Sequence, residues 1–164
     1  MLLLQSFHIK QFWAMQRVLD NIEAIIAVGE SFELRVNGYS MLPLLGYAGD
    51  VIIVRRTSAD EDIVGRIAMF RGVKGNIIVH RVLSVDSGVV RLRGDGNTAQ
   101  VESVQRAEII GVVDRVRRQS GVIVSCTEKM WRIKERLWLA IPLRVRGHVL
   151  AMLRRILDYK YNNR

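Results

Sequence analysis

The sequence predicts a mainly β protein, in which one compact β domain lies between an N-terminal helix and a C-terminal helical extension. Residues 8–28 carry apolar side chains at spacings of three and four, which is typical of an amphipathic helix. The next region holds short runs rich in valine and isoleucine, separated by tight turns. After it the helical period returns, together with many basic residues. We therefore divide the chain into 1–30, 31–125 and 126–164.

Composition supports a single hydrophobic core. The chain has 164 residues, of which 49% are hydrophobic and 25% are charged, and these values exclude a disordered protein. One cysteine, Cys126, excludes a disulfide framework and a cysteine-based zinc site. We expect no cofactor and no metal. No apolar stretch approaches 18 residues, and the run Met1–Leu4 is too short for a signal-peptide core. We expect a cytoplasmic protein, able to lie at a membrane surface.

The central region reads as a series of strands and turns. Apolar and charged residues alternate over 32–36, as in a half-buried strand. Asp86-Ser87-Gly88 between two apolar runs predicts a hairpin turn. The further expected strands are 51–54, 67–70, 77–85, 89–92 and 109–116.

Nearly all of the net charge of +9 lies in the last segment. Residues 1–128 hold 15 basic and 14 acidic side chains, whereas residues 129–164 hold 10 basic and 2 acidic ones. Trp131 and Trp138 share this segment with many leucines, a composition that suits a helix in a membrane surface. An anionic membrane is therefore the partner expected for 129–164. Nucleic acid is less favoured, because no helix-turn-helix precedes the β domain.

One serine and one histidine could carry chemistry. Ser40 lies in a turn between two strands, opened by Gly38 and closed by Pro43. A serine hydroxyl needs an adjacent base to become a nucleophile. His80 is the best candidate, since burial on an apolar strand favours the neutral form that a base requires. His8 and His148 lie in the terminal segments and are weaker candidates. Spacing alone favours a turn serine and a core histidine bonded to a backbone carbonyl over a catalytic pair.

Five separated blocks together suggest a family. They are Ser40-Met41-x-Pro43, Gly49-Asp50-x-x-x-Val54, Gly65-Arg66-Ile67-x-x-Phe70, Val79-His80-Arg81-Val82 and Gly94-Asp95-Gly96-Asn97. In order and approximate spacing these blocks resemble the signal peptidase I family over residues 34–118. The fourth block carries a histidine, as in the archaeal and endoplasmic-reticulum branch, whereas the bacterial main branch and LexA-type self-cleaving repressors have lysine there.

This resemblance implies a signal peptidase/LexA-like β domain and a serine endopeptidase acting on a peptide or protein precursor through an acyl-enzyme. Ser40 would be the nucleophile and His80 the general base. The acid that orients the histidine would be Asp95 or Glu102, or would be absent, and we take Asp95 as the first candidate. The residues expected to line the substrate groove are Tyr39, Met41 and Leu42.

The sequence departs from the family pattern in two ways. Many members carry a serine two positions before the nucleophile that helps to stabilise the oxyanion, and here that position is Gly38. The Ser40 N–H is the remaining candidate donor. Family members that process secretory precursors also have a membrane-spanning anchor, which this sequence does not predict. Two alternatives therefore stay open: a catalytically inactive peptide-binding relative, and a LexA-like regulator associated with nucleic acid. The substrate and its cleavage motif are not predicted.

Overall fold

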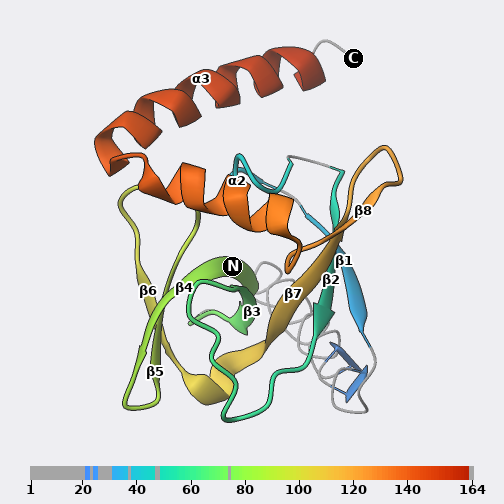
Figure 1. Cartoon of the computed structure of the whole chain (residues 1–164), viewed down its shortest axis with the longest axis vertical. Helices are drawn as coiled ribbons and strands as arrows, with labels where there is room; N and C mark the ends of the chain where they lie inside the picture. The colour runs from blue at the N-terminus through green and yellow to red at the C-terminus, as the bar shows by residue number, and fades with distance from the viewer. Residues whose placement is uncertain are drawn as a thin grey trace, which may run out of the picture.

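The computed structural model describes residues 21, 22, 24, 25, 31–36, 38–46, 49–73 and 75–162. The helix expected over 8–28 lies largely outside the described residues, although 21, 22, 24 and 25 are helical. The described part is dominated by one antiparallel sheet with two helices after it (Figure 1). The expectation of a mainly β fold is confirmed.

The sheet has eight strands, and its main path runs in the order β1-β2-β7-β3-β4-β5-β6, with β8 paired to β7. All pairs are antiparallel. A short 3₁₀ turn, Arg106–Glu108, connects β6 to β7. The strands are β1 (Phe32–Arg35), β2 (Val51–Arg55), β3 (Ile67–Arg71), β4 (Ile77–Asp86), β5 (Val89–Arg93), β6 (Glu102–Gln105), β7 (Ile109–Arg117) and β8 (Ile123–Ser125).

The core forms where the strands lose contact with water on both faces. In β3, four consecutive residues, Ile67 to Phe70, are at most 2% exposed, because the strand lies between β4 and β7. Burying an isoleucine, methionine or phenylalanine side chain contributes about 1.5–3 kcal/mol to the free energy of folding, so buried apolar runs of this kind hold the sheet together.

Strand β4 carries two polar residues into this interior. His80 pairs with Ala68, and Arg81 pairs with Ile67 and Arg93 across the neighbouring strands. Alternation predicts opposite faces for His80 and Arg81, yet both are buried, at 5% and 2% exposure. The reason is that the second face of β4 is covered as well: Arg81 contacts Glu135 of a helix.

Two helices follow the sheet, α2 (Lys129–Ala140) and α3 (Leu143–Asn162), with Pro142 between them. Figure 1 shows α2 lying across one end of the sheet and α3 beyond it. Trp131 and Trp138 of α2 are only 2% and 6% exposed. These two tryptophans therefore pack in the protein core, where burial of their large rings stabilises the fold, and they are not available to a membrane surface.

No helix among the described residues is long and apolar enough to cross a membrane.

Candidate functional site

The Ser40 turn is held in place by the core while Ser40 itself stays exposed. Met41, Leu42, Leu44 and Leu45 are all at most 7% exposed and belong to the main hydrophobic cluster. Within the turn, the Leu45 N–H donates to the Met41 carbonyl at 3.0 Å. The apolar side chains therefore fix the backbone on either side, and the one exposed hydroxyl in this segment sits on a rigid loop.

The Gly94–Asn97 turn packs directly against the Ser40 turn. The Gly96 N–H donates to the Ser40 carbonyl at 2.8 Å, and a Cβ on Gly96 would collide with the Tyr39 carbonyl oxygen. A Cβ on Gly94 would collide with the Ser40 carbonyl oxygen and lie 3.0 Å from Nε2 of His80. Only glycine fits at these two positions. Ser40 and His80 thus converge on Gly94, although they are distant in sequence.

Gly94 and Gly96 belong to the fifth sequence block, and the resemblance gave them no role at the site. Two glycines in a Gly-Asp-Gly-Asn segment are explained by turn chemistry alone. The close approach of a second turn to them has no local signature, so the sequence could not have indicated it.

His80 is oriented by Glu102. The Nδ1 atom of His80 lies 2.5 Å from Oε2 of Glu102, and the side-chain amide of Gln100 donates to Oε1 of the same carboxylate at 3.0 Å. The ring also contacts Phe70, with 6.1 Å between centroids. Because the carboxylate accepts the Nδ1 hydrogen, Nε2 is left as the acceptor, and it is Nε2 that lies beside Gly94.

Asp95, the first candidate for the orienting acid, does not contact His80. Both of its carboxylate oxygens accept hydrogen bonds from Arg81, at 2.8 and 2.6 Å, and its backbone carbonyl accepts from Nε1 of Trp138. This placement corrects the sequence expectation. The neighbouring position on β4 supplies a guanidinium whose planar fork matches a carboxylate better than an imidazole does.

Arg81 joins the site to α2. Besides Asp95, it donates to Glu135 at 2.7 Å and to the Gly65 carbonyl at 2.7 Å. Burial alone would lower the pKa of Arg81, but the hydrogen bonds and charges of Asp95 and Glu135 raise it above the usual value. Arg81 is therefore a permanent cation beside His80. Sequence reasoning gave Glu135 no role, since nothing in α2 indicates that it faces β4.

An apolar cleft of about 440 Å³ opens next to Ser40. Met41 lines it, as the sequence predicts for the substrate groove. Leu42 is not among the lining residues and packs in the main hydrophobic cluster. Tyr39 turns to α3 instead, where its hydroxyl donates to Asp158 and the Arg154 guanidinium stacks over its ring. The other lining residues are Ile22, Phe32, Leu34, Arg35, Val36, Ile52, Asn76, Ile77, Ile78 and Val79.

His148 and Cys126 do not line this cleft. Nδ1 of His148, on α3, lies 2.9 Å from the Arg144 carbonyl oxygen, and His8 lies outside the described residues. Burial raises the pKa of the Cys126 thiol to about 12, with a further contribution from the charge of Glu135. Among the described residues, no group of histidine, cysteine or acidic side chains could hold a metal ion.

Comparison with known protein families identifies a match. The family profile described as Peptidase S24-like matches residues 8–114, more than half of the chain. The match includes the Ser40 turn, His80 and Glu102, and it ends before α2 and α3. No curated protein matches the chain. The chain therefore belongs to the Peptidase S24-like family.

Proposed function

We propose that the protein is a serine endopeptidase of the signal-peptidase-like, Ser–His type, which cleaves a peptide or protein precursor. One observation carries the proposal: the Ser40 turn and Nε2 of His80 meet at Gly94, while Glu102 holds the opposite nitrogen of the same ring. A nucleophile, a base and a group that orients the base are the three parts that hydroxyl activation requires.

In the proposed mechanism, the Ser40 hydroxyl oxygen attacks the scissile carbonyl and gives its proton to Nε2 of His80. The resulting imidazolium is stabilised by the Glu102 carboxylate. When the carbon–nitrogen bond breaks, Nε2 returns the proton to the leaving amine, and an ester on Ser40 remains. Water then attacks this ester, again losing a proton to Nε2, and releases the acid and the free serine. Such proton transfer contributes about 10²–10⁴-fold in rate.

The tetrahedral oxyanion needs a donor, and we assign this role to the Ser40 N–H. No hydrogen bond joins this N–H to another described residue. Gly38 has a φ of 97°, in the region where side chains other than glycine are strained. This conformation explains why the additional serine found in many relatives is absent at position 38.

The cleft indicates the class of substrate. It lies between β1, which pairs only with β2 among the described strands, and the beginning of β4. An extended peptide can add its backbone to such an edge and place alternate side chains in an apolar groove. We therefore propose a substrate that presents small or medium apolar side chains before the scissile bond.

Two observations favour the Ser–His branch over the Ser–Lys arrangement of LexA-type proteins. By the resemblance of the sequence blocks, His80 stands where those relatives carry lysine, and its Nε2 lies beside Gly94, which also contacts the Ser40 carbonyl. Arg81, the adjacent cation, is bound to Asp95 and Glu135 and cannot release a proton at working pH.

A fluorophosphonate probe tests the proposal. Wild-type protein should form the covalent Ser40 adduct, Ser40→Ala should not, and Ser120→Ala in the exposed β7–β8 turn should react like the wild type. His80→Ala should lower the rate of labelling by about 10²–10⁴-fold without unfolding the protein. Equal labelling of wild type and Ser40→Ala would overturn the proposal. Peptide binding without acylation would identify an inactive relative, and intramolecular self-cleavage together with DNA binding would identify a LexA-like regulator.

A further inference from the structure

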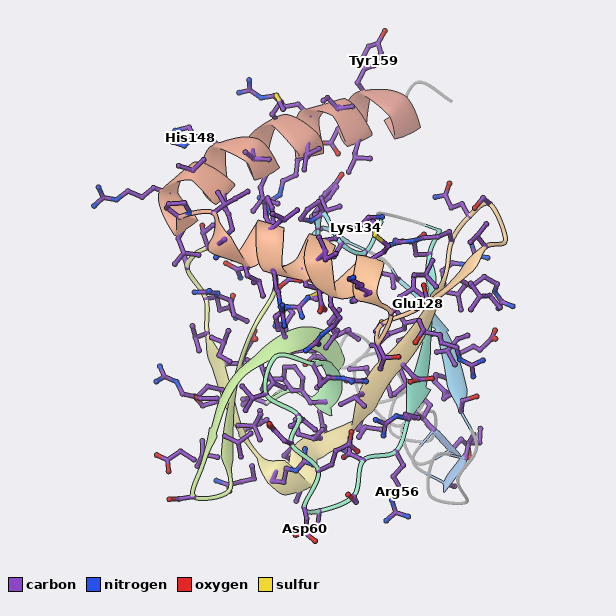
Figure 2. The ribbon with its side chains drawn as sticks, in the orientation of Figure 1. Arg56, Asp60, Glu128, Lys134, His148 and Tyr159 are labelled. Carbon is purple, nitrogen blue, oxygen red and sulfur yellow. The ribbon has the colours of Figure 1, made fainter. Side chains whose placement is uncertain are left out.

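We infer that the outer face of α3 binds an anionic membrane surface. This face consists of Val145, His148, Met152, Arg155, Ile156 and Tyr159. Its four apolar members are 49% (Val145), 58% (Met152), 54% (Ile156) and 76% (Tyr159) exposed. Figure 2 shows Tyr159 and His148 directed away from α2 and the sheet.

The inner face of α3, formed by Arg146, Val149, Leu150 and Leu157, attaches the helix to the protein. Arg146 and Leu150 are buried, and Val149 and Leu157 pack against the main core cluster. A surface helix normally has one apolar stripe toward the core and a polar face toward water. Here Val145, Met152 and Ile156 recur at spacings of seven and four beside Val149, so the apolar side of α3 extends past the part that packs on the core. This uncovered part remains in water unless something covers it.

The charges beside this stripe have one sign. The two acidic residues of 129–164 are both engaged elsewhere: Glu135 binds Arg81, and Asp158 accepts the Tyr39 hydroxyl. Arg144 and Arg155 are exposed and form no ion pair with a described residue. Each basic residue near an anionic lipid surface favours binding by about 1 kcal/mol. The outer face of α3 thus offers apolar and cationic groups together.

This combination favours lipid over other occupants. A symmetric contact with a second copy would place Arg144 and Arg155 against the same residues of the partner, and like charges would repel. Nucleic acid would neutralise the arginines but leave Met152 and Ile156 without an apolar environment. An anionic bilayer satisfies both, because headgroups meet the cations and acyl chains meet the apolar stripe.

The same helix contacts the Ser40 turn on its inner side. Arg154 donates to the Gly96 carbonyl at 2.6 Å and stacks over Tyr39, the residue before Ser40. Membrane binding through α3 would therefore hold the candidate site close to the bilayer. It would favour substrates that are themselves attached to a membrane; this consequence for the substrate rests on the proposed function, whereas the binding itself does not.

Vesicle co-sedimentation of the full chain tests the inference. We expect binding to phosphatidylcholine vesicles that contain phosphatidylglycerol, weak binding to pure phosphatidylcholine, and loss of binding at high salt. Met152→Glu and Ile156→Glu should each weaken binding at least about ten-fold, since a negative charge replaces an apolar group that would enter the bilayer. Val73→Glu is the matched control, because Val73 is 99% exposed and lies in the β3–β4 turn. Arg144→Gln and Arg155→Gln should each weaken binding about five-fold.

Several outcomes would overturn the inference. One is equal binding of wild type and Met152→Glu to anionic vesicles, and another is no binding by either. Preference for duplex DNA that depends on the arginines but not on Met152 would indicate nucleic acid instead. A concentration-dependent dimer that Met152→Glu abolishes would indicate a second copy. Fluorophosphonate labelling of Ser40 without vesicles should be the same in Met152→Glu and wild type, so this experiment and that of the proposed function fail independently.

Discussion

Oε2 of Glu102 lies 2.5 Å from Nδ1 of His80, while Nε2 of the same ring lies beside Gly94, against which the Ser40 turn packs. Glu102 begins β6 and His80 lies in β4, and the two strands are separated in the sheet by β5. The contact is possible because Glu102 pairs with Leu92 near the end of β5, just before the Gly94 turn. The strand arrangement thus brings the Glu102 carboxylate to one nitrogen of the ring, while the other nitrogen lies beside the Gly94 turn.

Glu102→Gln tests this relationship. The amide keeps the size of the side chain but removes the charge that stabilises the imidazolium, so we expect slower acylation of Ser40 with little change in stability. Gln100→Ala, which removes only a neutral hydrogen bond to Glu102, should have a much smaller effect. An unchanged rate of acylation in Glu102→Gln would show that the acid does not act through His80.

Gly94→Ala should abolish acylation. The new methyl group would collide with the Ser40 carbonyl oxygen and press on Nε2 of His80, so the two turns must separate. Gly147→Ala is the control, because a Cβ there meets no atom within 4 Å and alanine favours the helix. Labelling kinetics and a crystal structure of the variant would check the prediction. Normal activity in Gly94→Ala would contradict the close approach of Ser40 and His80.

Asp95→Asn and Glu135→Gln should lower stability, because each removes a charge from the buried cluster around Arg81. The side chains of Arg81, Asp95 and Glu135 are at most 7% exposed. Breaking a buried ion pair costs about 3–5 kcal/mol, and since Arg81 keeps one partner in each variant we expect the lower end of this range. Urea unfolding measures the loss. Glu128→Gln, at an exposed position before the same helix, should change stability by less than about 1 kcal/mol. A similar small effect at all three positions would contradict a structural role for the cluster.

Cys126 should be inert in the folded protein. Its pKa is raised to about 12 by burial, so the reactive thiolate is scarce at neutral pH. We expect no alkylation by iodoacetamide at pH 8 in native buffer, rapid alkylation in urea, and no effect of the reagent on labelling of Ser40. Fast modification of the native protein would show that Cys126 is accessible.

Repeating patterns along the chain were sufficient for the mainly β class and the hairpin at Asp86-Ser87-Gly88, because alternation and turn residues are local properties. The candidate pair of Ser40 and His80 also came from the sequence, through the resemblance of five short blocks. Those features need no knowledge of what lies across the sheet.

Only the tertiary structure shows that Glu102, and not Asp95, contacts His80. It also shows that Tyr39 and Leu42 do not line the expected groove and that Trp131 and Trp138 are buried. In each case the outcome depends on which surface a distant segment covers. Arg81 binds Asp95 because α2 closes over β4 and removes both from water, and a buried guanidinium must find carboxylates. Competition of this kind between partners far apart along the chain leaves no trace in spacing or composition.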